Sequence, residues 1–318
     1  WTWDEGDKRL AWGLAVGYKN TGLGGRAQDK ATAEVEAWQD PDKGLLAEVR
    51  ISSAEMGQGL PGVLAACAAE ELGIPAENVG VLLGDTDVCP DGGPTTASRQ
   101  TFVSGNAARL AARDAASKLA DAPGTRVVTR HEYWAPGTQP LGTGGDMHFA
   151  FGFCAQAVLC EIEMETGKVH VRKVIAAHDV GRAINPLTLE GQIEGGIVMC
   201  IGYALTEHYI QEQAEPWTSV MARYKMPGIG HSPKIISHIV EHQTSTGPYG
   251  AKGVGELPSI PTSAAITNAI YRATGIRVRS LPVDQDELLR AMQTGEPEVE
   301  MGWGDHKAIP DIGMRGQQ

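Results

Sequence analysis

Glycine is the residue that most limits what this chain can fold into. It accounts for 40 of the 318 residues, roughly twice its usual share in proteins. The glycines follow no triplet repeat, which excludes a collagen helix, and many stand between stretches patterned as strands or helices. We therefore predict a folded chain of strands and helices in which glycine shapes the connecting loops.

Strand-like and helix-like stretches occur in both halves of the chain. We expect strands at 10–18, 31–38, 45–52, 78–83, 149–165, 168–177 and 235–241, and helices at 60–72, 106–120, 186–207 and 261–274. Two polar loops, 85–104 and 136–145, interrupt the pattern. The predicted fold class is therefore α/β (α+β) with two lobes. The divisions are 1–122 for the first lobe, 123–145 for a connecting loop, 146–294 for the second lobe and 295–318 for a tail.

Charge and apolar content exclude several classes of function. The net charge is −12 and no run of Lys or Arg is present, so nucleic acid and anionic membranes would be repelled. No apolar run approaches the ~20 residues that cross a bilayer, and residues 1–5 lack the basic and apolar regions of a signal peptide. The five cysteines form no C-x-x-C pair, so we expect no zinc or iron–sulfur site held by this chain alone, and a reduced, cytoplasmic setting.

Two glycine-rich segments in the first half suit a polar ligand. In Glu-Met-Gly-Gln-Gly at 55–59, the amide of Gln58 stands beside the exposed N–H groups of a predicted helix start. The segment Gly-Gly-Pro-Thr-Thr-Ala-Ser-Arg-Gln at 92–100 offers hydroxyls and an amide with little bulk, as a pterin carrying a phosphate would require. The alternatives are a turn with a solvent-facing Gln58 and a loop capped by Ser104 and Asn106.

Two further segments lie in the second half. At 178–196, His178 is interpreted as a structural partner of Asp179, and three glycines in the following helix imply close packing against another helix or a ligand. At 247–258, Glu256 follows a glycine loop and has apolar neighbours in the sequence, so we expect the apolar surroundings that suit a general base. The alternative is an exposed Glu256 with Lys252 as a loose surface partner.

In their order and spacing, these four segments resemble the molybdenum hydroxylases of the xanthine dehydrogenase and aldehyde oxidoreductase family. The matching motifs are EMGQG, GGPTTASRQ, DVGRAINP with EGQIEGG, and GPYGAKGVGELP, and the resemblance extends from Leu10 to Met292. It covers only the C-terminal half of the family's molybdenum-binding region. It therefore implies a two-lobed molybdopterin-binding domain that is one subunit of a split enzyme or a piece of a longer polypeptide.

The resemblance also implies roles for individual residues. The general base of the family, the Glu of its GVGE motif, falls on Glu256, and an aromatic residue facing the substrate falls on Tyr18. No protein side chain is expected to ligate the metal, because the pterin holds it, although Ala97 would lie beside it. The cofactor-binding positions fall on Gly57, Gln58, Thr96, Ala97, Ser98, Arg99, Gln100, Gln192, Gly253, Val254 and Gly255.

The implied cofactor is molybdenum with molybdopterin, either as such or as the cytosine dinucleotide. The implied partners are a second molybdopterin-binding subunit and subunits carrying [2Fe-2S] clusters and FAD, in a dimer of heteromers. The implied reaction is hydroxylation of a C–H carbon of an N-heterocycle (purine-like or nicotinate-like) or an aldehyde, with oxygen from water. The alternatives are carbon monoxide oxidation, dehydroxylation of an aromatic thioester, and a non-catalytic cofactor-binding module, against which the intact Glu256 argues.

Overall fold

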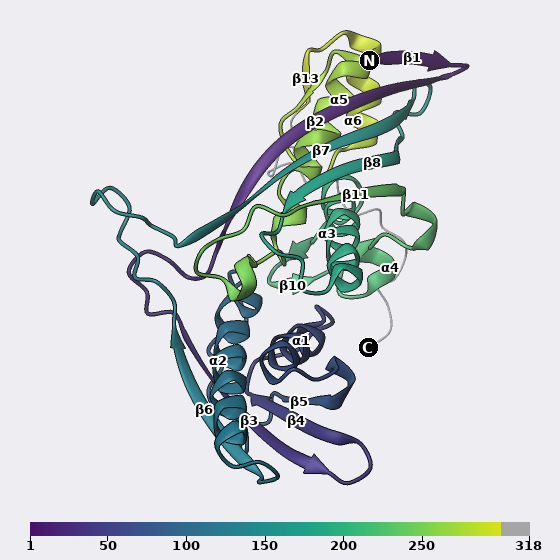
Figure 1. Cartoon of the computed structure of the whole chain (residues 1–318). Helices are drawn as coiled ribbons and strands as arrows, with labels where there is room; N and C mark the ends of the chain where they lie inside the picture. The colour runs from purple at the N-terminus through teal and green to yellow at the C-terminus, as the bar shows by residue number, and fades with distance from the viewer. Residues whose placement is uncertain (300–318) are drawn as a thin grey trace.

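Two β-sheets, each with helices packed on it, organise the chain (Figure 1). The computed structural model describes residues 1–299, so most of the expected tail at 295–318 lies outside the described residues. The larger sheet has the strand order β1-β2-β7-β8-β11, and the smaller has the order β5-β4-β3-β6. The mixed α/β fold predicted from the sequence is therefore confirmed.

The larger sheet is built on two long antiparallel strands. Strand β2 pairs with β7 along its whole length, from Lys8 opposite Glu163 to Thr21 opposite Ala150. Strand β8 continues the sheet antiparallel to β7, and β11 lies parallel to β8. The strands of this sheet are β1 (Thr2–Glu5), β2 (Lys8–Thr21), β7 (Ala150–Glu163), β8 (Val169–Asp179) and β11 (Lys234–Val240).

The smaller sheet is centred on β3, whose alanine and valine side chains are buried. Strand β3 pairs antiparallel with β4 on one side and with β6 on the other, and β5 lies parallel to β4. The strands of this sheet are β3 (Lys30–Asp40), β4 (Gly44–Ile51), β5 (Val79–Leu83) and β6 (Val127–Trp134).

Helices α1 (Leu60–Leu72) and α2 (Gln100–Asp121) belong to the smaller sheet, and α3 (Pro186–Leu205) and α5 (Thr262–Thr274) to the larger. The buried face of α2 consists largely of alanine, which lets this long helix lie close to β3 and β6. No helix within residues 1–299 is both long and apolar enough to span a membrane. The remaining elements are α4 (Met221–Tyr224), α6 (Gln285–Thr294), β9 (Gln211–Glu212), β10 (Glu215–Pro216), β12 (Arg277–Val278) and β13 (Glu298–Val299).

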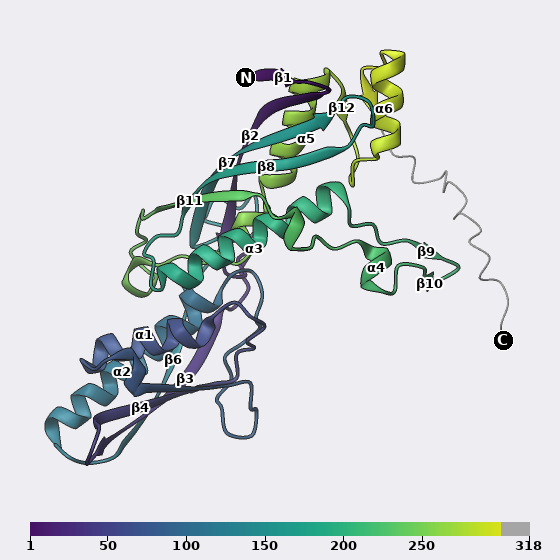
Figure 2. The same ribbon diagram turned by 90° about the vertical axis from the view of Figure 1, so that its right-hand side faces the viewer.

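The observed sheets divide the chain differently from the predicted lobes. Residues 8–21 pair with β7 and not with the first lobe, and in Figure 1 the purple strand β2 lies beside the teal strand β7. The expected connecting loop at 123–145 also contains strand β6. The reason is that strand pairing depends on which surfaces bury each other, and this is independent of distance along the chain. Helix α3 lies between the larger sheet and the pair α1 and α2 (Figure 2).

Candidate active site

A cavity of about 670 Å³ lies where the two sheet-and-helix units meet. This volume is within the ~300–1,000 Å³ that is usual for small-molecule sites. Each of the four segments singled out in the sequence contributes to its wall. The predicted residues that line it are Gly57, Gln58, Thr96, Ala97, Ser98, Arg99, Gln100, Gln192, Val254, Gly255 and Glu256, whereas Gly253 and Tyr18 are not among the lining residues.

The segment before α1 folds onto itself. The carboxylate of Glu55 accepts hydrogen bonds from three backbone N–H groups around the start of α1. The amide of Gln58 accepts from the N–H of Met56 at 2.7 Å and donates to the carbonyl of Ala54 at 2.8 Å. Gly57 has a φ of 102°, and no atom of residues 1–299 lies within 4 Å of the position that a Cβ would take there. Gln58 therefore lines the cavity with its amide already bonded to its own loop.

The segment before α2 is a strained turn that leads into an uncapped helix. Ala97 and Ser98 adopt left-handed backbone conformations, with φ of 51° and 52°, and such residues cost about 1–3 kcal/mol each. Helix α2 begins directly after this turn, and its N-cap residue, Arg99, makes no side-chain cap hydrogen bond. Among the described residues, the first N–H groups of α2 therefore have no side-chain partner at the helix start, beside the cavity, and this arrangement favours an anionic group.

The side chains of Arg99 and Gln100 hold the surrounding loop together. Arg99 is fully buried, its Nε atom donates to Asp29 Oδ1 at 2.6 Å, and its Nη atoms donate to three backbone carbonyls. The amide of Gln100 donates to Thr95 Oγ1 at 2.8 Å. The side chains that we predicted to bind the cofactor are thus engaged in shaping the wall of the cavity.

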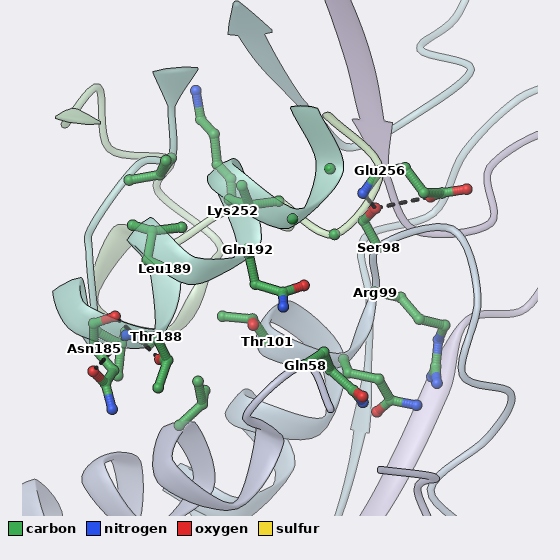
Figure 3. A pocket seen from close by; sticks show the side chains of 18 of the residues that line it. Gln58, Ser98, Arg99, Thr101, Asn185, Thr188, Leu189, Gln192, Lys252 and Glu256 are labelled. Atoms are coloured by element: carbon green, nitrogen blue, oxygen red, sulfur yellow. Dashed lines mark hydrogen bonds between the residues drawn. The ribbon is translucent and has the colours of Figure 1, made fainter. Parts of the chain in front are cut away.

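Helix α3 presents an amide to the cavity. Its N-cap is Asn185, with Oδ1 accepting from the N–H of Thr188 at 3.3 Å. Gln192, on the next turn, extends from α3 into the cavity (Figure 3), and within residues 1–299 its amide has no hydrogen-bond partner. It is therefore available to a bound ligand.

The glycines of α3 confirm the predicted close packing at one position. A Cβ atom at Gly196 would lie 2.9 Å from Pro258 Cβ, so the helix and the segment after Glu256 are in direct contact. Nothing within residues 1–299 lies within 4 Å of such an atom at Gly191 or Gly195. These two glycines leave open surface on α3.

The carboxylate of Glu256 is fixed through one of its two oxygens. Oε2 accepts a hydrogen bond from Ser98 Oγ at 2.8 Å (Figure 3) and lies 3.1 Å from Lys19 Nζ. The backbone N–H of Glu256 in turn donates to Ser98 Oγ at 3.0 Å. The side chain is 51% exposed, so the predicted apolar surroundings are wrong. The adjacent Leu257 is fully buried and belongs to the interior instead.

Lys19 was not predicted from the sequence, whereas its neighbour Tyr18 was. Successive side chains of a strand point to opposite faces of the sheet. Lys19 lies on the face that meets Glu256, and Tyr18 is exposed, with its ring 5.8 Å from that of Phe151. The predicted substrate-facing residue therefore lies outside the cavity lining, and the residue beside it contacts the candidate base.

Two pairings expected from sequence proximity are wrong. Lys252 is buried and forms an ion pair with Asp179 at 2.6 Å, so it is not a surface partner of Glu256. His178 is therefore not paired with Asp179. Its Nδ1 atom has no hydrogen-bond partner within residues 1–299, and burial lowers the pKa of this histidine to about 4. His178 is a neutral, buried side chain at neutral pH.

The groups around the cavity fit a polar organic cofactor. Within residues 1–299, no group of three or more His, Cys, Asp or Glu residues could hold a metal ion. The cavity offers the uncapped start of α2, hydroxyl groups, the free amide of Gln192 and the backbone at Gly57, which no side chain within residues 1–299 covers. Such donors suit a phosphate group and a heterocyclic ring.

The sequence is similar to those of known proteins. A model of the molybdopterin cofactor-binding domain matches residues 2–233. The chain is 32% identical to the gamma subunit of the 6-hydroxypseudooxynicotine dehydrogenase complex of Paenarthrobacter nicotinovorans, over 77% of this chain and 36% of the relative. It is also 32% identical to the aldehyde oxidoreductase molybdenum-binding subunit PaoC of Escherichia coli K12, over 90% of this chain and 41% of the relative.

The fold comparison gives a similar result. The crystal structure of the aldehyde oxidoreductase from Desulfovibrio desulfuricans ATCC 27774 matches with a TM-score of 0.81 and 31% identity, over 91% of this chain and 33% of that protein. The chain therefore spans between a third and about two fifths of the length of these relatives.

Proposed function

Since the chain belongs to the family of molybdopterin cofactor-binding domains, we propose that it forms part of the active site of a molybdenum hydroxylase. The proposed reaction replaces a C–H bond of an N-heterocycle or an aldehyde with a bond to oxygen derived from water. Glu256 is the general base. One relative is named for 6-hydroxypseudooxynicotine and another for aldehydes, so both kinds of substrate belong in the first screen.

The observation that carries this proposal is the asymmetric environment of the Glu256 carboxylate. Ser98 and Lys19 both contact Oε2. Within residues 1–299, Oε1 has neither a hydrogen bond nor an ion-pair partner. A carboxylate held by one oxygen presents the other in a defined direction, as a proton acceptor needs. Oε1 of Glu256 is therefore the atom that takes the proton.

Other groups of the chain hold and orient the cofactor. When bound, the molybdenum cofactor supplies the oxidant that accepts two electrons from the substrate. The N–H groups at the start of α2 and the amide of Gln192 are placed to bind its polar and anionic parts. The exposed half of Glu256 is covered only when cofactor, substrate and the missing part of the domain are in place, and water is then excluded from the base.

The names of two relatives support a multi-subunit enzyme. Both are named as subunits, and both are more than twice as long as the matched part. We propose that a second molybdopterin-binding part completes the cavity. Electrons then pass to [2Fe-2S] clusters and FAD on further subunits, and the assembled enzyme is a dimer of heteromers in the cytoplasm.

The test is the Glu256→Gln variant in the assembled enzyme, with kcat, KM and molybdenum content measured together. Loss of a general base costs about 10²–10⁴-fold in rate, so we expect kcat to fall by that amount while the molybdenum content stays within twofold. The control is Glu190→Gln, an exposed carboxylate on α3 that does not line the cavity. Wild-type kcat in Glu256→Gln would remove the base assignment.

A further inference from the structure

The turn that follows Glu256 packs closely against the larger sheet and its helices. Residues Leu257–Ser259 form a single 3-10 turn, η4. Three glycines, one each on β2, β7 and α3, leave room for the apolar side chains of this region. A Cβ atom would lie 2.7 Å from Ile260 Cγ2 at Gly17, 2.9 Å from Leu257 Cδ2 at Gly152 and 2.9 Å from Pro258 Cβ at Gly196.

Side chains from the larger sheet and its helices also form hydrogen bonds with the backbone of this turn. The amide of Gln156 on β7 donates to the carbonyl of Pro258 at 2.7 Å. Two thiols donate to the neighbouring carbonyls. Cys200 Sγ lies 2.9 Å from Ser259 O, and Cys154 Sγ lies 3.6 Å from Leu257 O. Burial raises the pKa of Cys154 to about 11, so this thiol keeps the proton that it donates. The carbonyl groups of residues 257–259 therefore accept hydrogen bonds from side chains outside the turn.

Gln156 is the best defined of these contacts. Its side chain is fully buried, and its Oε1 atom accepts a hydrogen bond from Thr262 Oγ1 at 2.6 Å. Its Nε2 atom, besides donating to Pro258, lies 3.4 Å from His178 Nε2. Hydrogen bonds thus hold both the oxygen and the nitrogen of the amide. Because a buried amide that loses its partners costs free energy, the position of this side chain is well determined.

The turn has a short hydrogen bond of its own, from the hydroxyl of Ser259 to the carbonyl of Glu256 at 2.8 Å. Its own backbone hydrogen bonds are long, at 3.2 Å from Leu257 N to Val254 O and 3.3 Å from Ser259 N to Glu256 O. The carboxylate of Glu256 is half exposed and projects from the start of this turn. A shift of the turn therefore moves the carboxylate directly.

We propose that Gln156 is a positioning residue for Glu256, acting through its hydrogen bond to the carbonyl of Pro258. The inference rests on the proposed role of Glu256 as the base. Gln156 itself, fully buried behind the turn, is outside the cavity lining and contacts no reacting group. A displacement of ~1 Å at a reacting centre can cost about 100-fold in rate, so we expect an effect of that order on kcat.

The experiment replaces Gln156 with Met, which has a similar length and no donor, in the assembled enzyme. The control is Thr129→Val on β6, which removes a buried hydrogen bond of 2.8 Å to the carbonyl of Ala111, far from the turn. We expect kcat of Gln156→Met to fall about 100-fold, with KM and molybdenum content within about twofold of wild type. Amide hydrogen exchange at residues 254–260 should become about tenfold faster or more. The control should leave all four quantities unchanged.

A second variant keeps the proposal testable if Gln156→Met does not fold. Thr262→Val removes the hydroxyl that orients the amide and that also donates to the carbonyl of Pro258 at 3.2 Å, and we expect the same changes at smaller size. Unchanged exchange at 254–260, or faster exchange with wild-type kcat, would refute the positioning role. An active Glu256→Gln enzyme would instead refute the base assignment, whatever the exchange measurement shows, so the two failures are distinguishable.

Discussion

The Nζ atom of Lys19 lies 3.1 Å from Oε2 of Glu256, and this contact joins strand β2 to the loop that carries the candidate base. Ser98 donates to the same oxygen. Both fixed contacts therefore fall on one side of the carboxylate, and the charge is compensated without occupying Oε1. The candidate base and the two side chains that contact it come from three separate segments of the chain.

The first prediction concerns this ion pair. We expect Lys19→Met to lower kcat about tenfold, because Glu256 keeps the hydrogen bond from Ser98 but loses its second contact, and a charged hydrogen bond is worth about 1.5–3 kcal/mol before exposure reduces it. Lys19→Arg keeps the charge and should recover most of the rate. Steady-state kinetics of both variants, with molybdenum content as the reference, give the answer. Equal kcat in Lys19→Met and wild type would show that Ser98 alone positions the carboxylate.

The sequence located the cavity but missed Lys19, which contacts the carboxylate of Glu256. Its four segments are recognisable because glycines and hydroxyl residues cluster where strands meet helices, and all four line the cavity. Which strand lies beside Glu256 depends on the pairing of β2 with β7, and no local pattern encodes this pairing. The resemblance therefore points to Tyr18 and not to Lys19, although one residue along a strand decides which face a side chain occupies.

The start of α2 shows a second limit of local patterns. The helix was expected at 106–120 because Ser104 and Asn106 are good caps, yet it begins at Gln100. The early start follows from tertiary contacts. Arg99 is drawn inward by Asp29, and the left-handed turn at Ala97 and Ser98 directs the chain into the helix. Buried ion pairs between distant residues leave no periodic signal in a sequence.

The second prediction follows from that ion pair. The guanidinium of Arg99 is 0% exposed and the side chain of Asp29 is 3% exposed, so Asp29→Asn leaves an uncompensated buried charge. Breaking a buried pair from one side costs about 3–5 kcal/mol, and we expect the free energy of unfolding to fall by this amount in urea denaturation. The control is Glu132→Gln, which breaks the exposed pair with Lys30 and should cost less than about 1 kcal/mol. Equal losses in the two variants would contradict the structural role of Arg99.

The third prediction is a pH dependence of stability that arises at His178. Burial lowers the pKa of this histidine to about 4 in the folded state, whereas an unfolded histidine titrates near ~6.5. Between these values the unfolded chain binds a proton that the folded chain does not, so stability falls as the pH drops through this window. The slope is about 1.4 kcal/mol per pH unit and the total is about 3 kcal/mol.

Because other groups also titrate in this range, the test compares variants. Unfolding of wild type and His178→Gln is followed at pH 7.5, 6 and 5, and the glutamine can still accept the hydrogen bond from Gln156. We expect the destabilisation caused by His178→Gln to shrink as the pH falls, because the substitution removes the cost of keeping a buried histidine neutral. The exposed His238 on β11 provides the control, since His238→Gln should leave the wild-type dependence intact. A difference between wild type and His178→Gln that does not change with pH would mean that His178 takes up a proton in the folded state, and that water or a partner reaches its Nδ1 atom.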